Sequence, residues 1–293
     1  MSVVLVSATA VALFVWFQVR AFDKSIEKAW DIPLRELEVT ITKQTIARGR
    51  HISESIGGCS NGECHGADLG GGTPIDMRPL GRVSGPNLTS GGLGSVYSDA
   101  ELVRVIEYGV KKDGHSLRFM PSFELSWLSD EDLSALIAFL RTRPAVERAP
   151  GPIELGVLWK VMDRQGVGVV LDVARHMAQH APEKAPPPAP TAEYGYYVAR
   201  TCIGCHGSTM SGGPIPGAPP DMPIPANITP HETGLKNWSF SDFEVLLDQG
   251  IKPDGAKLDA FMPLAALSHM NSVERQALWR YLRTLQARPF GRR

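Results

Sequence analysis

A pattern that occurs twice constrains this chain more than any other feature of its sequence. The stretch from Ile106 contains "GVKKDG" and then "FMP", and the stretch from Leu246 contains "GIKPDG" and then "FMP". Each copy continues into a helical pattern that ends in Phe- or Tyr-Leu-Arg-Thr. Two copies are too few for a solenoid, so the repeat predicts a tandem pair of small domains. Four landmarks recur at offsets of 140 to 142 residues: Cys64 and Cys205, His65 and His206, Asn87 and Asn227, and Met120 and Met262.

Short helices account for the apolar pattern within each copy. Ser98 and Glu101 form a capping-box pattern ahead of one helix, and Ser129 precedes another with apolar residues at helical spacing. The matching helices of the second copy are expected to begin at Ser241 and Asn271. A further helix with an internal glycine is expected just before the cysteines of each copy, with Gly49 in the first and Gly195 in the second.

No stretch of useful length alternates like a strand, and the 29 glycines and 23 prolines indicate many loops and turns. Small helical, loop-rich domains need a staple, and a buried cofactor would serve as one. We therefore predict a mostly α chain with a transmembrane anchor over residues 1–22 and a first domain over 23–150. An interdomain bridge with a Pro-rich linker follows over 151–190, and a second domain over 191–293.

The anchor is predicted from Ser2 to Val19, which form an apolar stretch of 18 residues without a charge. That length is at the lower end of what spans a bilayer. A cleaved secretory signal would begin with positive charges, which are missing here. The stretch therefore favours an uncleaved transmembrane helix, although Arg20 and Lys24 beyond it would place the following domains in the cytoplasm by the positive-inside rule.

The motif "CIGCH", from Cys202 to His206, carries the sharpest chemical signal. Two thiols at this spacing can add to the two vinyl groups on one edge of a haem, and His206 is then placed to ligate the iron. A thioredoxin-like redox pair would require an α/β pattern, and a structural zinc site would require further Cys or His ligands at matching spacing. The motif therefore favours covalently attached haem c.

The opposite face of the iron needs a second axial ligand, and Met120 and Met262 are the candidates. Methionine supplies a soft thioether donor suited to haem iron, and the following proline disfavours helix at the methionine. A single such methionine would more often be a packing residue, but two in register with two Cys-His sites indicate ligands. Met77 and Met222 are less suitable, because their distances from the histidines differ between the copies.

The motif "CSNGECH", from Cys59 to His65, matches "CIGCH" through the repeat but has four residues between its cysteines instead of two. A disulfide between Cys59 and Cys64 is one alternative, and a haem held by Cys64 alone is another. Asn-Gly is a strong turn former, so the insertion can bulge while both thiols reach the haem. We therefore expect two thioethers at this site as well, with His65 as the iron ligand.

Asn87 and Asn227 are weaker candidates for cofactor binding. Each begins an Asn-x-Thr segment that could donate hydrogen bonds to haem propionates, but turn capping explains the same residues equally well. No Ser-His-Asp arrangement or phosphate-binding glycine loop is present. The 30 Lys and Arg residues balance the 31 Asp and Glu residues, so we expect no nucleic-acid partner.

Together, "CIGCH", the two "FMP" motifs, "PNLT" with "ANIT", and "LSDEDLSALIAFLRTRP" resemble class I c-type cytochromes. More narrowly, the chain resembles the membrane-anchored dihaem cytochromes of bacteria that are related to the cytochrome c subunits of membrane-bound alcohol and gluconate dehydrogenases. The resemblance covers the chain from about Asp31 onward, apart from the bridge. It implies two tandem cytochrome c-like domains with two covalent haem c groups. The implied axial pairs are His65 with Met120 and His206 with Met262.

A His/Met pair fills both axial positions, so such an iron changes charge without binding substrate. The expected function is therefore single-electron transfer by a carrier that is not itself an enzyme. The resemblance implies a periplasmic relay, tethered by a single pass to the bacterial inner (cytoplasmic) membrane and its lipid. Its partners would be redox proteins of a respiratory, dehydrogenase or photosynthetic complex, or a soluble cytochrome. The alternatives are a dihaem peroxidase-like enzyme and a structural haem subunit of a larger assembly.

Overall fold

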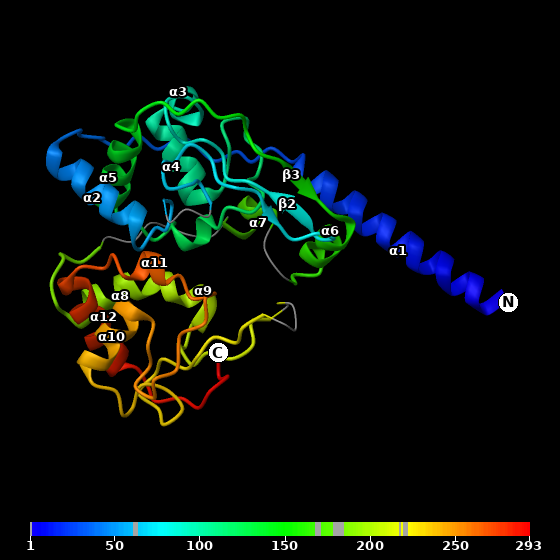
Figure 1. Cartoon of the computed structure of the whole chain (residues 1–293). Helices are drawn as coiled ribbons and strands as arrows, with labels where there is room; N and C mark the ends of the chain where they lie inside the picture. Colours follow the sequence, from blue (N-terminus) through cyan, green and yellow to red (C-terminus); the bar gives the residue numbers. More distant parts are fainter. Residues whose placement is uncertain (1, 61–63, 168–170, 178–184, 217, 219–221) are drawn as a thin grey trace. The chain divides into compact units, whose positions relative to one another are not determined.

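The computed structural model describes the chain except for residues 1, 61–63, 168–170, 178–184, 217 and 219–221, and of residues 2–7 and 176 only the backbone. Helices dominate it (Figure 1). The chain forms two compact units that do not follow one another in sequence. Unit 1 contains residues 1–39, 62–126 and 140–181, and unit 2 contains residues 40–61, 127–139 and 182–293. The predicted linear domain boundaries stay a prediction beside this division.

Unit 1 combines short helices with a small sheet. Its helices are α1 (Ser2–Ile26), α3 (Leu93–Val96), α4 (Asp99–Tyr108), the 3-10 helix η1 (Ser122–Glu124), α6 (Val157–Arg164) and α7 (Val173–Met177). Its strands are β1 (Ile75–Asp76), β2 (Gly81–Val83) and β3 (Ile153–Leu155).

Unit 2 is helical over the residues that the structure describes. It contains α2 (Lys43–Glu54), most of α5 (Asp130–Arg141), α8 (Ala192–Ala199) and the 3-10 helix η2 (Arg200–Cys202). It continues with α9 (Ile203–His206), α10 (Phe240–Gln249), α11 (Leu264–Leu267) and α12 (Ser272–Thr284).

Helix α1 corrects the predicted anchor. Within the part of the chain that the structure describes, no helix combines the length and the apolar character needed to cross a bilayer. The end of α1 packs against α6, where Phe22 is buried with Trp159, and Asp23 accepts a hydrogen bond from Lys160 at 2.7 Å. Apolar residues of α1 thus join a protein core, and charged residues follow within the same helix. The predicted transmembrane helix and the single-pass location in the inner membrane are therefore wrong, and lipid contact through this helix is unsupported.

The small sheet of unit 1 is absent from the sequence predictions. Its strands pair antiparallel in the order β1-β2-β3, with Val83 opposite Ile75 on one side and opposite Ile153 on the other. Strands of two or three residues are too short to produce an alternating pattern, which is why none was expected. Strand β3 and helices α6 and α7 come from the segment predicted as a bridge, and all three lie in unit 1.

Two glycines define matching helix crossings in unit 2. A Cβ atom on Gly49 of α2 would overlap the carbonyl oxygen of Ala135 in α5. A Cβ atom on Gly195 of α8 would overlap the carbonyl oxygen of Ala277 in α12 in the same way. Both helix pairs therefore approach so closely that only glycine fits. The equivalence of the two crossings supports the duplication that the sequence predicts.

The helix starts agree with the sequence in most places. Ser98 caps α4 in a capping box with Glu101, and Asn271 caps α12 in the same manner, as predicted. The prediction for Ser241 is wrong, because α10 begins two residues earlier and is capped by Ser239. An acidic residue stands three positions after both serines, so the capping pattern alone could not choose between them.

Candidate functional site

The motif of the second copy folds into a single helical turn. Cys202 ends η2, and Cys205 and His206 lie in α9. The Nδ1 atom of His206 lies 2.7 Å from the carbonyl oxygen of Ala226. A carbonyl only accepts, so Nδ1 carries the proton and Nε2 keeps the lone pair that a metal ion requires. Burial lowers the pKa of His206, and this favours the neutral, ligating form.

The first copy repeats this arrangement at His65. Its side chain is buried, and its Nδ1 lies 2.9 Å from the carbonyl oxygen of Pro86. Burial lowers the pKa of this histidine too. A Cβ atom on Gly85 would overlap the carbonyl oxygen of Cys64, so a glycine is needed where the two loops meet. Both histidines are therefore held with Nε2 available as a donor.

The inserted residues of the first motif lie partly outside the described residues. Asn61, Gly62 and Glu63, on which the predicted bulge depends, are not described by the structure. Cys59 belongs to unit 2 and Cys64 to unit 1. All four cysteines are thiols in this structure. The predicted thioether of Cys59 stays a prediction.

The loops after the two histidines have the same backbone. The Gly71 amide donates to the His65 carbonyl at 2.9 Å, and the Gly212 amide donates to the His206 carbonyl at the same distance. Leu69 and its counterpart Met210 are both buried, and both have a φ of 59°, which is uncommon for residues other than glycine. An unusual conformation that recurs at matching positions indicates that both copies build one kind of site.

The two Phe-Met-Pro motifs also form one kind of turn. The Ser122 amide donates to the Met120 carbonyl at 2.9 Å, and the Leu264 amide donates to the Met262 carbonyl at 2.7 Å. The proline between them has φ −82° and ψ 68° in the first copy and φ −74° and ψ 63° in the second. These are inverse γ-turns, and both methionine side chains are partly buried. Their predicted role as axial ligands stays a prediction.

Asn87 and Asn227 hold their own loops. The Oδ1 atom of Asn87 accepts from the amide of Thr89 at 2.9 Å and from its hydroxyl at 2.7 Å, and Nδ2 donates to the Val146 carbonyl at 2.7 Å. Asn227 makes the same set with Thr229 and with the carbonyl of Arg288. Since each asparagine directly follows the carbonyl that orients a histidine, this turn positions that carbonyl. Contact with haem propionates stays a prediction.

Sequence reasoning missed the two orienting carbonyls and two arginines. The guanidinium of Arg293 donates to the carbonyls of Cys205 at 2.8 Å and Gly213 at 2.9 Å. Its charge, together with burial, lowers the pKa of His206. In the first copy, Arg148 donates to the Gly71 carbonyl at 2.7 Å. The arginines lie about 80 residues from these partners, so no local pattern indicates them, whereas the repeat itself marks the positions before Asn87 and Asn227.

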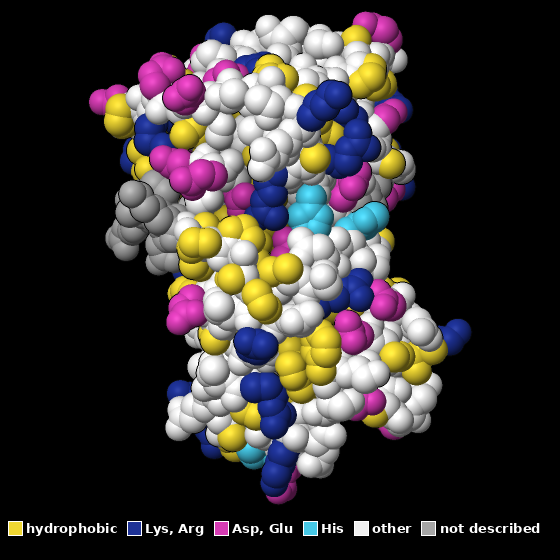
Figure 2. Space-filling model, turned by 90° about the vertical axis from the view of Figure 1, so that its left-hand side faces the viewer, with side chains coloured by type: hydrophobic (Ala, Val, Ile, Leu, Met, Phe, Trp, Pro, Cys, Tyr) yellow, Lys and Arg dark blue, Asp and Glu magenta, His cyan; other side chains and the backbone are white. Residues whose placement is uncertain are grey.

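The surface carries no dominant charge over the face that can be seen. On the face shown in Figure 2, Lys and Arg side chains lie among Asp and Glu side chains, and hydrophobic side chains are scattered between them. The formal net charge of the chain is −1. Long-range electrostatic attraction to a strongly charged partner therefore has little support.

Each copy thus presents a cysteine-flanked histidine with a free Nε2 and a methionine in a tight turn, which together define the haem site of a cytochrome c. Residues 44–140 match the family described as cytochrome c oxidase, cbb3-type, subunit III, and residues 192–286 match the cytochrome c family. The chain carries two cytochrome c domains, and this confirms the resemblance to c-type cytochromes and indicates haem c as the cofactor.

The relatives are cytochrome c subunits of dehydrogenases. The alcohol dehydrogenase (quinone) cytochrome c subunit of Gluconacetobacter polyoxogenes is 35% identical over 30% of this chain and 20% of its own length. The corresponding subunit of Gluconobacter oxydans is 25% identical over 78% of this chain and 52% of its own length. The fructose dehydrogenase cytochrome subunit of Gluconobacter japonicus is 31% identical over 32% of this chain and 21% of its own length.

The matches thus span about a fifth to a half of the length of these relatives. The chain is homologous to cytochrome c subunits. This homology agrees with the expectation of an electron carrier rather than an enzyme.

Proposed function

We propose that this chain is a dihaem c-type cytochrome that relays single electrons as the cytochrome subunit of a dehydrogenase complex. The support comes from one repeated observation. In both copies a backbone carbonyl takes the Nδ1 proton of a buried histidine, so that Nε2 is available for iron. A buried histidine with no ligand would have no need for the same orientation twice.

The residues of each copy fit a haem c. Cys202 and Cys205 flank His206 on one turn, so their thiols would hold the porphyrin edge while Nε2 of the histidine binds one face of the iron. Met262 would supply the thioether on the other face. Cys59, Cys64, His65 and Met120 would do the same in the first copy. When bound, haem c supplies an iron that changes between its ferrous and ferric states.

The ligand set favours electron transfer over peroxidase chemistry. A peroxidase requires an open coordination position on one iron, whereas a methionine on the second face closes that position. Both copies hold their methionine in the same γ-turn, with the methionine carbonyl bonded across the following proline. We therefore assign the same closed ligand set to both sites, and no feature of either copy favours the enzyme.

The dehydrogenase partner is proposed from the relatives. They are cytochrome subunits of alcohol, fructose and nicotinate dehydrogenases, among others. The near-neutral net charge and mixed surface of this chain suit a lasting contact with a partner subunit better than steering of a soluble carrier from a distance. The electron donor is then the catalytic subunit of a dehydrogenase for a small organic substrate.

The haem sites can be tested by spectroscopy and mass. Optical and EPR spectra of the purified full chain should change at one haem in Met120→Ala and at the other in Met262→Ala. Unchanged spectra in both variants would remove the closed ligand set and favour an enzyme. The partner can be tested separately by affinity capture of a tagged full chain from its native cells, followed by identification of the bound subunits. Reduction of the captured haem by an alcohol or sugar substrate supports the proposal, and capture of an oxidase alone contradicts it.

A further inference from the structure

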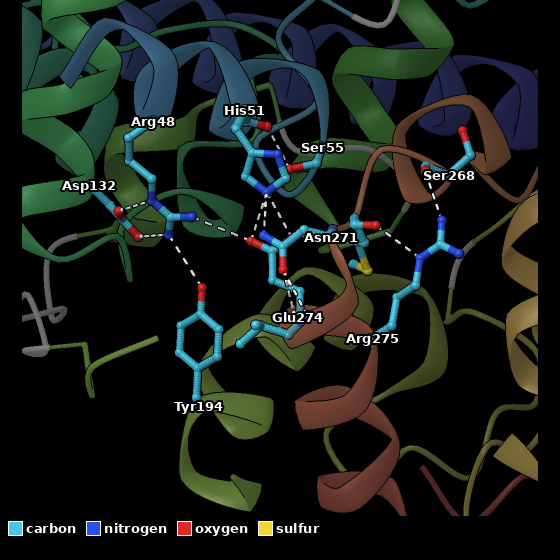
Figure 3. A network of polar contacts seen from close by, with 11 residues as sticks. Arg48, His51, Ser55, Asp132, Tyr194, Ser268, Asn271, Glu274 and Arg275 are labelled. Carbon is cyan, nitrogen blue, oxygen red and sulfur yellow. Dashed lines mark hydrogen bonds and ion pairs between the residues drawn. The ribbon is translucent and has the colours of Figure 1, made fainter. Parts of the chain in front are cut away.

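A buried polar network joins helices of the two repeats inside unit 2 (Figure 3). Helices α5 and α12 are equivalent in the repeat, and each has an acidic residue at its third position, Asp132 and Glu274. Both acidic side chains are buried, and Glu274 is 0% exposed. Buried carboxylates require strong partners, and part of the partners of each comes from the other repeat.

On the first side of the network, Asp132 of α5 is bound from α8 and α2. The hydroxyl of Tyr197 in α8 donates to Asp132 Oδ2 at 2.7 Å and accepts from the Ser129 amide at 3.1 Å. Burial and the nearby Asp132 charge raise the pKa of Tyr197, so the hydroxyl keeps the proton that it donates. Arg48 of α2 binds the same carboxylate with two nitrogens, at 2.7 and 2.8 Å.

The second side mirrors the first, with the repeats exchanged. His51 of α2 places its Nε2 at 2.8 and 2.7 Å from the two carboxylate oxygens of Glu274 in α12. The same nitrogen lies 3.4 Å from the side-chain amide of Asn271, the residue that caps α12. In the aligned repeats, His51 of α2 corresponds to Tyr197 of α8, and Asn271 corresponds to Ser129.

Equivalent positions thus meet in a reciprocal way. The first repeat places a residue of its N-terminal helix on the start of α12, and the second repeat places the equivalent residue on the start of α5. Arg48 lies between the two sides, because it also reaches Glu274 and the Tyr194 hydroxyl, each at 3.4 Å. The pattern is that of an isologous interface, in which one patch serves both partners.

We propose that the α2/α5 helix pair of the first repeat and the α8/α12 pair of the second form a permanent, pseudo-twofold interface that binds the two repeats to each other without the linker. The occupant of each face is the matching helix pair of the same chain. Charge complementarity specifies this pairing, since the buried Glu274 receives its cationic side chains, Arg48 and His51, from the other repeat. Trp127 packs edge-on against Tyr197 with ring centroids 4.9 Å apart, and so closes the interface on the α8 side.

The test cuts the linker of the otherwise intact full chain. A specific protease site is inserted between Pro187 and Pro188, the chain is cleaved after folding, and the fragments are run on size-exclusion columns over a range of concentrations. We expect the cleaved fragments to elute together. In a Tyr197→Phe/Glu274→Gln double variant they should dissociate at concentrations at least tenfold higher. Glutamine still accepts the Asn271 amide of the capping box, so α12 keeps its start.

A matched control keeps the result specific. Lys236→Ala removes an exposed ion pair with Glu232 in the same unit and should leave the dissociation unchanged. Far-UV circular dichroism of the uncleaved variants identifies any loss of folding. Separation of the unsubstituted fragments overturns the interface, and unchanged association of the folded double variant overturns the role of the network. Neither outcome depends on haem or on a redox partner, so the test is independent of the proposed function.

Discussion

The Nδ1 atom of His206 lies 2.7 Å from the carbonyl oxygen of Ala226, 20 residues further along the chain. That bond selects the tautomer, and the tautomer decides which ring nitrogen can bind a metal. The orientation of the ring therefore depends on how firmly the loop with Ala226 is held. Asn227, the next residue, holds it through Thr229 and the carbonyl of Arg288.

Replacement of this asparagine tests the dependence. Asn227→Ala leaves the buried Thr229 amide and hydroxyl without their acceptor, and this should cost about 1–3 kcal/mol of stability. Chemical denaturation followed by circular dichroism measures the loss. The spectrum of the second haem should broaden as the ring of His206 loses its fixed orientation.

Thr233→Ala provides the control for that variant. The Thr233 hydroxyl also accepts from Asn227 Nδ2, at 2.9 Å, but the residue is exposed. Its replacement should change the stability by no more than about 0.5 kcal/mol. An equal loss in both variants would show that the asparagine does not hold the loop through Thr229.

Glycine at the helix crossing gives a prediction of sign. Propensity alone predicts that Gly195→Ala stabilises α8 by up to about 1 kcal/mol. The added Cβ atom would overlap the Ala277 carbonyl, so we expect a net destabilisation of about 1–3 kcal/mol instead. Thermal unfolding of the full chain measures it. Glu193→Ala, at an exposed position of the same helix, should stay within about 0.5 kcal/mol, and a stabilised Gly195→Ala variant would contradict the close crossing.

These examples show which parts the sequence could predict. Attachment cysteines, histidine and methionine are encoded in short motifs, and the repeat confirms the register of each motif by comparison with the other. The carbonyl of Ala226 and the arginines are brought to the site by folding alone, so no motif contains them. Helix α1 misled the prediction because an apolar helix that ends in a protein core has the same composition as one that ends in lipid. The sheet of unit 1 escaped because its strands are only two or three residues long.

Stability should depend on pH through Glu124 of η1. Burial raises the pKa of this carboxyl above its unfolded value, so the folded state binds the proton more tightly. Stability is then highest below the unfolded pKa and is lost as the pH rises through the folded pKa. Glu124→Gln should therefore stabilise the chain at pH 7 and give no gain near pH 3. Unfolding curves at both pH values measure this, with the exposed Glu147→Gln as the control that should differ little at either.

Arg293 should tune one haem and not the other. Its positive charge lies against the carbonyls of Cys205 and Gly213, and oxidation adds a positive charge to the haem. Arg293→Gln should therefore stabilise the ferric form and lower the midpoint potential of the second haem, by an amount on the order of 1 kcal/mol. Spectroelectrochemical titration resolves the two haems. Arg148→Gln should act on the first haem instead, and a shift of both potentials in either variant would contradict a local effect.

Cys59 determines how the first haem is held. If the inserted residues bulge as predicted, both thiols of "CSNGECH" form thioethers, and Cys59→Ala removes one of two covalent bonds. The intact mass after denaturation should then still include two haems in this variant, because Cys64 keeps its bond. Cys64→Ala provides the matched variant, and Cys59→Ala/Cys64→Ala should lose one haem from the denatured mass. Digestion of the unsubstituted chain should give a haem-linked peptide in which both cysteines are modified. A peptide with an unmodified Cys59 would establish attachment through Cys64 alone, and the opening of the first motif would then have no part in holding the cofactor.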